Sequence, residues 1–132
     1  MASRSTRRKP CILIVDDDPN IREALRDAIA FWQCVAVTAA SGLEALDILA
    51  HRHVDAVLCD VVMPGMDGAE TLREVQQRLP ALPVIMMGAM MTPDLRRHLC
   101  DIGAQSCLAK PMDRKELAQA LSPCCVPAVR GS

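Results

Sequence analysis

The chain has 132 residues, of which 51% are hydrophobic but only 2% aromatic, and its formal net charge at pH 7 is −1. This length suits one domain with a core of its own, built from aliphatic side chains rather than from aromatic rings. A charge so close to zero gives no general electrostatic attraction to nucleic acid or to anionic lipid. No apolar run approaches the length of a membrane span and no secretory signal is visible, so we expect a cytoplasmic protein.

Cysteines are numerous for a chain of this size. There are seven, an odd number, and no C-x-x-C pair occurs. Most lie within apolar runs, which favours small buried side chains in a reducing cytoplasm. A zinc site is disfavoured because the three histidines do not fall in ligand spacing with the cysteines. Cys124 and Cys125, in a tail that contains proline, are expected to be exposed and to oxidise in vitro.

The first strand and the first helix are predicted within residues 11–32. Residues 11–15, CILIV, form a continuous apolar run, as expected for a strand covered on both faces. Asp18 followed by Pro19 predicts an N-cap and a proline in the first helical turn. The inward face of this helix is predicted from apolar residues at helical spacing: Ile21, Ala24, Leu25, Ala28, Ile29 and Trp32.

The second and third strands follow the same plan. A strand is predicted over 34–39, and Ser41 with Glu44 forms the pattern of a capping box that opens the next helix. A short third strand is predicted over 56–59.

After the third strand, residues 63–68, MPGMDG, contain the proline and the glycines of a loop. The helix that follows is predicted to place Leu72, Val75 and Leu79 on its inward face and to stop before Pro80.

The last part of the chain repeats the alternation. A fourth strand is predicted over 83–87, Thr92 and Pro93 start a helix, and Gly103 suits its C-terminal end. A fifth strand is predicted over 106–109. The final helix is predicted from its capping residues and its apolar positions: Asp113, Glu116, Leu117, Ala118 and Leu121.

Five strand–helix units in succession predict an α/β fold with a parallel sheet and helices on both faces. One domain is predicted over residues 10–122, between a flexible basic arm at 1–9 and an irregular tail at 123–132. In sheets of this kind, the ligand site lies beyond the carboxyl ends of the strands, at the point where the strand order reverses.

Charged residues stand at the carboxyl ends of three of the predicted strands. Asp16, Asp17 and Asp18 follow the first strand, Asp60 follows the third, and Lys110 follows the fifth. Carboxylates so close together disfavour one another's ionisation, and a hard divalent cation such as Mg²⁺ would offset that repulsion. A carboxylate between Mg²⁺ and an ammonium group is well placed to attack phosphorus and to become an aspartyl phosphate.

Structural roles compete with this interpretation at each position. Asp18 before a proline is most simply a helix cap. Asp16 and Asp17 could be solvated loop residues, Asp60 could cap a helix, and Lys110 could be a surface lysine. Their positions directly after buried strands favour the functional role for these four.

Four segments carry a resemblance to a known family: ILIVDDDPNIREAL at 12–25, DAVLCDVVMPGMDG at 55–68, PVIMM at 83–87 and AKP at 109–111. They are similar to the receiver domains of two-component response regulators, over roughly residues 10–122. The resemblance implies a flavodoxin-like, doubly wound sheet with strand order 2-1-3-4-5.

The resemblance also implies roles for single residues. Asp60 would be the phosphoacceptor, taking its phosphoryl group from the phosphohistidine of a sensor histidine kinase or of a histidine phosphotransfer protein. Asp17 would bind Mg²⁺ directly, and Asp16 would help through a water, with Mn²⁺ able to substitute. Asp60 and the backbone carbonyl of Val62 would complete the protein ligands. Lys110 would pair with the phosphoryl group or with Asp60.

A further implication is a cis peptide bond between Lys110 and Pro111. Two positions, however, depart from the family pattern. Gly88 stands where the family usually has Ser or Thr at the end of the fourth strand, and Cys107 stands where it often has an aromatic residue. Both parts of the usual switch are thus absent. Either the backbone at Gly88 and Ala89 contacts phosphate and rearranges, or the domain signals weakly or passes phosphate onward.

Output is expected through protein contacts or through an effector domain absent from this chain, without direct binding to nucleic acid or membrane. The resemblance implies a homodimer or effector contact on the face of the fourth helix, fifth strand and fifth helix. Met86 and Met87 are expected to pack in the core, whereas Met90 and Met91 would offer a flexible partner surface. Apolar residues at Val62 and Met90 are predicted to slow the loss of the phosphoryl group.

Three functional hypotheses follow. The first is a signalling domain that catalyses its own phosphorylation and dephosphorylation and is not a metabolic enzyme. The second is a degenerate receiver that acts as a docking module without phosphorylation. The third is a small haloacid-dehalogenase-type phosphatase, whose Asp-x-Asp arrangement Asp16 and Asp18 formally satisfy, although such enzymes need acidic residues beyond Glu116.

Overall fold

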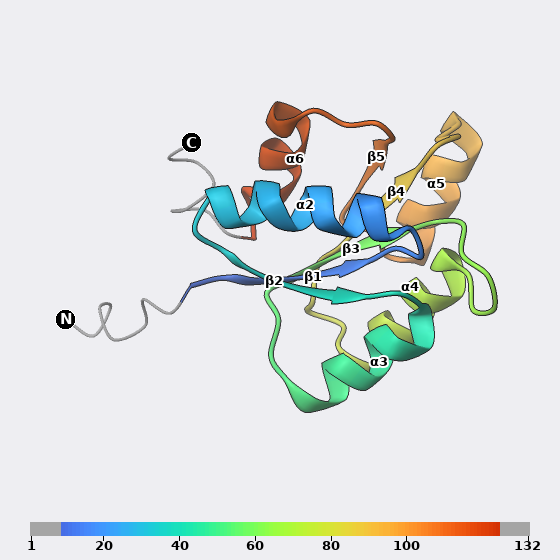
Figure 1. Cartoon of the computed structure of the whole chain (residues 1–132). Coiled ribbons are helices and arrows are strands. Elements are labelled where there is room, and N and C mark those ends of the chain that lie inside the picture. The colour runs from blue at the N-terminus through green and yellow to red at the C-terminus, as the bar shows by residue number, and fades with distance from the viewer. Residues whose placement is uncertain (1–8, 125–132) are drawn as a thin grey trace.

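The computed structural model describes residues 9–124, so most of the predicted arm and the tail from Cys125 onward lie outside the described residues (Figure 1). Five strands form one parallel sheet in the order β2-β1-β3-β4-β5, which confirms the predicted fold class and strand order. In chain order the elements are β1 (Cys11–Val15), α2 (Pro19–Phe31), β2 (Val35–Ala39), α3 (Gly42–His51), β3 (Ala56–Asp60), α4 (Gly68–Arg78), β4 (Val84–Gly88), α5 (Pro93–Ile102), β5 (Ser106–Ala109) and α6 (Arg114–Leu121).

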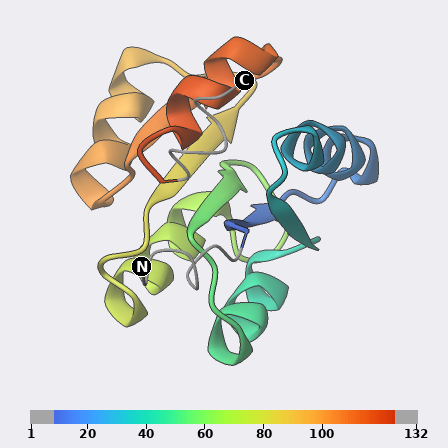
Figure 2. The same ribbon diagram turned by 90° about the vertical axis from the view of Figure 1, so that its left-hand side faces the viewer.

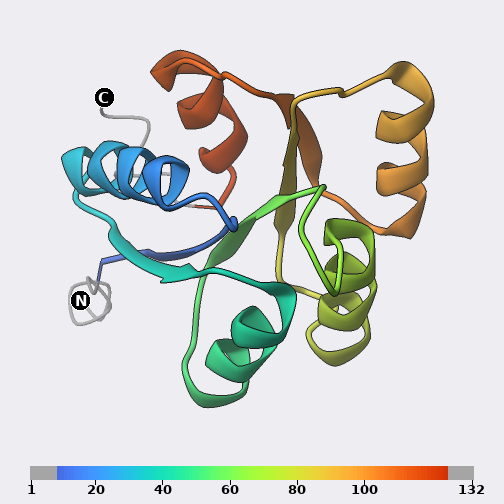
Figure 3. The same ribbon diagram turned by 45° about the vertical axis from the view of Figure 1, so that its right-hand side comes forward.

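The helices cover both faces of the sheet. Helices α2 and α6 lie on one face, and α3, α4 and α5 lie on the other, as Figure 1 and Figure 3 show. Figure 2 shows the same layers after a quarter turn. Because successive residues of a strand point to opposite faces, β1 supplies both cores. Ile12 and Ile14 pack under α2 and α6, whereas Leu13 and Val15 pack on the other face.

The two cores are mainly aliphatic, as the composition predicts, and Trp32 is the one aromatic side chain among their buried residues in the described chain. Met86 faces α3, α4 and α5, Met87 faces α2 and α6, and both are fully buried, which confirms their predicted packing role. The other fully buried large side chains come from the central strands and from the inward faces of the helices: Ile12, Leu13, Ile14, Val15, Ile29, Leu58, Leu72, Ile85, Leu99 and Leu121.

Polar side chains fix where the helices start. The Asp18 side chain accepts from the Asn20 amide at 2.9 Å, so the predicted cap of α2 is present. Reciprocal capping boxes begin α4 at Asp67 and α6 at Asp113. At α3 the predicted box takes another form, because the Glu44 carboxylate accepts from the amide of Ala40.

The structure corrects several details of the sequence prediction. Strand β2 begins at Val35, and Cys34 is buried in the turn before it. Strand β4 runs one residue later than predicted, from Val84 to Gly88, because Pro83 has no amide hydrogen for the ladder. Leu79 is the C-cap of α4 and is 39% exposed, so it does not join the inward face. Ala24 of α2 is also exposed.

Four of the cysteines are buried in the described chain, namely Cys11, Cys34, Cys59 and Cys107. Cys100 is exposed, and Cys124 is half-buried rather than exposed as predicted. Cys125 lies outside the described residues. Over residues 9–124, no helix combines the length and the apolar character that crossing a bilayer requires.

Candidate acidic site at the carboxyl edge of the sheet

The predicted functional residues meet at one edge of the sheet. β1 and β3 are neighbours, with Val15 opposite Cys59, so Asp16 and Asp60 come one residue later on adjacent strands. β5 lies two strands away from β3, and Lys110 follows it immediately. The strand order reverses between β1 and β3, which is where ligands bind in open α/β sheets.

Three carboxylates form a compact group at this edge. Asp16, Asp17 and Asp60 each offer an oxygen, and these oxygens all lie within 4.8 Å of one another. Asp16 is completely buried and Asp60 is 6% exposed, whereas Asp17 is open to solvent. Three hard oxygen ligands with an exposed side suit Mg²⁺ or Mn²⁺, which keep several waters.

Lys110 bridges two of these carboxylates. Its Nζ donates to Asp16 Oδ2 at 2.7 Å and lies 3.3 Å from Asp60 Oδ1. The other oxygen of Asp16, Oδ1, accepts from the Asp18 amide at 2.9 Å. Both Asp16 oxygens therefore have protein partners, which suits an indirect role through water and leaves Asp17 and Asp60 better placed for direct contact with a cation.

The ionisation of Asp60 reflects this crowding. Burial raises the pKa of the Asp60 carboxyl above its ordinary value, and the nearby Asp16 charge raises it further. The ammonium of Lys110 and a hydrogen bond from the Val62 amide act in the opposite direction, but the net pKa stays raised. The pKa of Lys110 is also raised: burial alone would lower it, but the hydrogen bond and charge of Asp16, with the charge of Asp60, outweigh burial.

The loop after β3 is held tightly against the site. Val61 donates to the Met87 carbonyl at 2.8 Å and accepts from the Gly68 amide at 2.9 Å. A Cβ on Gly68 would lie 2.1 Å from the Asp60 carbonyl oxygen, so only glycine allows α4 to start this close to Asp60. Val62 points outward and is 76% exposed. That its carbonyl serves as a metal ligand stays a prediction.

The end of β4 borders the site from the other side. The Gly88 carbonyl accepts from the Lys110 amide at 2.9 Å, which ties β4 to the start of the lysine turn. A Cβ on Gly88 would meet the Val61 Cγ2 methyl at 3.3 Å and the Met91 Cε methyl at 3.5 Å. Met91 thus packs onto the core instead of forming open surface, whereas Met90 is 75% exposed. Ala89 is exposed beside Gly88.

The turn between Lys110 and Pro111 has a cis peptide bond. Cys107, in the middle of β5, is buried against the α5 side of the sheet. Its carbonyl accepts from Arg96 Nη1 at 2.7 Å.

Sequence reasoning missed Arg22. From the first turn of α2, its Nη1 donates to the Asp16 carbonyl at 2.8 Å and so holds the backbone of the acidic turn. A basic residue soon after three aspartates was the available signal, but position alone does not reveal that this guanidinium turns back toward the strand end.

The phosphatase arrangement is not formed. Asp18 is exposed, its Oδ1 caps α2, and it is not part of the acidic group. The Asp-x-Asp pair that Asp16 and Asp18 would have supplied is therefore not directed at one site.

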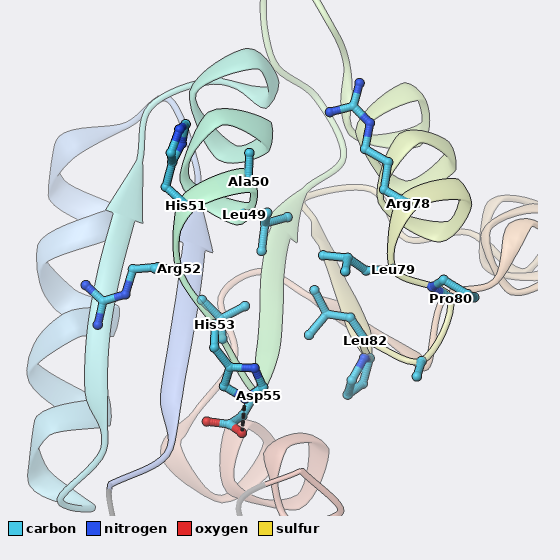
Figure 4. Close-up of a pocket in the computed structure, with 13 residues that line it drawn as sticks. Leu49, Ala50, His51, Arg52, His53, Asp55, Arg78, Leu79, Pro80 and Leu82 are labelled. Carbon is cyan, nitrogen blue, oxygen red and sulfur yellow. Dashed lines mark hydrogen bonds and ion pairs between the residues drawn. The ribbon is translucent and has the colours of Figure 1, made fainter.

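A separate pocket lies at the opposite edge of the sheet. It has a volume of about 700 Å³ and opens between the ends of α3 and α4 and the turns that precede β3 and β4 (Figure 4). His53 Nε2 lies 3.2 Å from Asp55 Oδ1 on its wall. Asp16, Asp17 and Asp60 do not line this pocket, so it is separate from the acidic group.

Comparison with known proteins agrees with the geometry. The family model described as the response regulator receiver domain matches residues 12–122. Response regulator MprA of Mycobacterium sp. (strain KMS) is 39% identical over 106 residues, which cover 80% of this chain and 46% of that protein. The sensor histidine kinase RcsC of Escherichia coli is 36% identical over 111 residues, 84% of this chain and 12% of the kinase. The chain thus spans less than half the length of these curated relatives.

A solved structure shows the same fold. In the CheX–CheY–BeF₃–Mg²⁺ complex from Borrelia burgdorferi, the matching chain has a TM-score of 0.86 and 28% identity, covering 91% of this chain and 92% of that one. The match of the family model to most of the chain, together with relatives at 39% identity, leads to one conclusion: this chain belongs to the response regulator receiver domain family.

Proposed function

We propose that the domain accepts a phosphoryl group on Asp60 from a phosphohistidine of a partner protein, in a reaction that requires Mg²⁺ or Mn²⁺. The observation that supports this most directly is the group of three carboxylate oxygens within 4.8 Å, with Lys110 bridging Asp16 and Asp60. A structural ion pair would need one carboxylate for one ammonium. Here three acids gather around one base, which leaves negative charge for a cation to neutralise.

The residues at this edge of the sheet have different roles in the transfer. An Asp60 carboxylate oxygen forms the new bond to phosphorus while the bond from phosphorus to the histidine nitrogen breaks and its electron pair stays on the imidazole. Lys110 would then pair with the phosphoryl oxygens. Its hydrogen bond to Asp16 keeps the ammonium at this edge of the sheet. Asp17 and Asp60 would hold Mg²⁺, with Asp16 acting through water. When bound, the cation supplies positive charge that offsets the charge of the transferred group.

The comparisons support the cofactor and the partner. The Borrelia structure is a complex of CheX, CheY, BeF₃ and Mg²⁺ that contains a receiver of the same fold, and one relative is a sensor histidine kinase. We propose a histidine kinase or a histidine phosphotransfer protein as the phosphoryl donor, a cytoplasmic location, and slow hydrolysis of the phosphoryl group by the domain itself. Residues 10–122 would form the functional unit.

The readout is proposed to differ from the usual one. Gly88 has no hydroxyl to reach the phosphoryl group, and Cys107 has no ring to move. The exposed Ala89 next to Gly88 would bring backbone amides to the phosphoryl oxygens, and the face of α5, β5 and α6 would meet a second copy or an effector. Exposed Val62 and Met90 would leave no polar side chain to direct water at phosphorus, and so would prolong the phosphorylated state. A phosphoryl lifetime no longer than that of Val62→Asn would contradict this point.

Incubation with Mg²⁺ and acetyl phosphate, followed by intact-mass analysis, tests the proposal. We expect one phosphoryl adduct that survives acid, is lost in base and does not form in excess chelator. Asp60→Asn should form none, whereas the control Asp94→Asn, at an exposed residue paired with Arg97, should react like wild type. Failure of the wild-type protein to form an adduct while it still binds Mg²⁺ would overturn the phosphoacceptor role.

A docking module without phosphorylation is the second candidate, and the specific observation in its favour is the double departure at Gly88 and Cys107. It predicts that a partner binds wild type and Asp60→Asn equally well, with or without acetyl phosphate. Binding that changes on phosphorylation of wild type only would reject it.

A further inference from the structure

Two cysteines face each other between α5 and β5. Cys107 lies in the middle of β5 and is 6% exposed, and its side chain belongs to the core on the α5 side, with Leu99 and Met86. Burial raises the pKa of the Cys107 thiol, and the neighbouring thiol of Cys100, on the last turn of α5, raises it further. The pair is thus formed across two elements of the fold and does not depend on the site at Asp60.

A separate contact fixes the same alignment of helix and strand. Arg96 Nη1 donates to the Cys107 carbonyl at 2.7 Å, so the Arg96 face of α5 is turned toward this point of β5. Cys100 is four residues after Arg96, and residues four apart lie on one face of a helix. Cys100 therefore lies on the same side of α5 as the guanidinium that reaches Cys107.

The two thiols differ in access to solvent. Cys100 is exposed, so a small oxidant in solution reaches it directly. Cys107 is buried, and burial raises the pKa of its thiol to about 11, which keeps it protonated and slow to react with oxidants from solution. An accessible thiol beside a protected one is the arrangement in which the first is oxidised and the second resolves it.

We propose that Cys100 and Cys107 form a redox modification site, at which a peroxide oxidises the two thiols to a reversible intrachain disulfide between α5 and β5. The Cys100 thiolate attacks one peroxide oxygen, so that an S–O bond forms, the O–O bond breaks and water leaves after protonation. The Cys107 sulfur then attacks the sulfenic sulfur of Cys100. The S–S bond forms, the S–O bond breaks, and the Cys107 proton leaves with the hydroxyl as a second water.

The balance closes with hydrogen peroxide as oxidant. Two thiols and one peroxide give one disulfide and two waters, and the two electrons come from the two sulfurs. A dithiol reductant reverses the reaction by thiol–disulfide exchange. The link would tie α5 covalently to the strand that leads into Lys110.

Peptide mapping of the full chain tests the site. The protein, freed of reductant, is treated with hydrogen peroxide, its remaining thiols are alkylated, and disulfide-linked peptides are identified by mass spectrometry. We expect a monomer with one link, between the peptides of Cys100 and Cys107, that dithiothreitol removes. Cys124→Ser, at a half-buried thiol elsewhere, should form the same link to the same extent.

Variants of each member test the order of the two steps. Cys107→Ser should leave a sulfenic acid at Cys100 that dimedone traps, and Cys100→Ser should leave Cys107 unoxidised. If serine at the buried position unfolds the chain, Cys107→Ala replaces it. A wild-type protein in which Cys107 stays alkylatable after Cys100 is oxidised would overturn the proposal, as would a disulfide from Cys100 to Cys124 or Cys125.

Discussion

Replacing Asp60 with asparagine should make the fold more stable in the absence of Mg²⁺. Asp60→Asn keeps the size of the side chain and its oxygen acceptor but removes one negative charge from the acidic group. The ionised Asp60 carboxylate lowers the stability of the fold, because burial and the charge of Asp16 both raise the pKa of this carboxyl. Lys110, which lies 3.3 Å away, offsets only part of that cost.

The distances give the size of the effect. With an effective dielectric constant of about 20, two like charges within 4.8 Å of each other repel by at least about 3.5 kcal/mol, and opposite charges 3.3 Å apart attract by about 5 kcal/mol. The substitution removes the repulsion from Asp16, a smaller screened repulsion from Asp17, and the desolvation penalty of a buried ion, which is several kcal/mol. It loses part of the attraction to Lys110, whose hydrogen bond an amide oxygen still accepts. The net gain should be about 1–3 kcal/mol.

The pH dependence has a definite sign. Because the folded-state pKa of Asp60 is raised above its ordinary value of 3.8, the folded state binds more protons than the unfolded state just above that value. The contribution of Asp60 to the free energy of unfolding therefore increases as the pH falls through the folded-state pKa and decreases as the pH rises. Asp60→Asn should lose this contribution, so its advantage over wild type should shrink on acidification.

Urea unfolding in chelator and in Mg²⁺ measures the effect. At a concentration of ten times the dissociation constant, Mg²⁺ should stabilise wild type by about 1.4 kcal/mol and Asp60→Asn by clearly less. The difference in unfolding free energy between the two proteins should therefore become smaller. Asp94→Asn is the control and should stay within about 0.5 kcal/mol of wild type in both conditions. A destabilised Asp60→Asn in chelator, or equal stabilisation of both proteins by Mg²⁺, would refute the electrostatic reasoning.

Three further changes follow from the same contacts. Lys110→Met should lower the free energy of unfolding by about 3 kcal/mol, since it leaves Asp16 buried without its counter-charge, and Mg²⁺ should restore part of the loss in urea unfolding; no loss would mean that the ion pair is not formed. Gly68→Ala should cost about 1–3 kcal/mol and slow the modification by acetyl phosphate, because the new methyl meets the Asp60 carbonyl; unchanged urea midpoints and rates would show that the loop yields freely. Leu72→Ala should cost about 2–5 kcal/mol in the same assay, whereas the exposed Leu43→Ala should cost under about 0.5 kcal/mol, and similar losses would place Leu72 outside the core.

The fold was accessible from sequence because each strand and each helix carries its own local signal. Residues 11–15 are apolar on both faces, and the structure buries all five between two helical layers. Asp18 has the right neighbour, Pro19, to start a helix, and it caps α2 as predicted. Parallel strands bring their carboxyl ends to one edge, so Asp60 and Lys110 could be expected near each other although fifty residues separate them along the chain.

What the sequence could not supply is the direction of individual side chains. Leu79 has helical spacing with Leu72 and Val75, but α4 ends at Arg78 and the cap residue turns outward. Met91 follows Met90 in the same loop, yet its methyl covers Gly88 while Met90 stays exposed. Such choices depend on tertiary packing, which periodicity does not encode.

The contact of Arg22 with the Asp16 carbonyl has the same origin. A long flexible side chain at the start of a helix reaches many groups, and only the folded turn selects one of them. The preference of Lys110 for Asp16 over Asp60, 2.7 Å against 3.3 Å, was likewise not predictable from residue order.

The most direct test of the central claim is to locate the phosphoryl group. Protein treated with Mg²⁺ and acetyl phosphate is reduced with borohydride, which converts an aspartyl phosphate to homoserine, and its peptides are sequenced by mass spectrometry. The acidic group around Asp60 predicts homoserine at position 60 alone, and none when chelator replaces Mg²⁺. Homoserine at position 16 or 17, or equal conversion at position 60 without a divalent cation, would contradict the account.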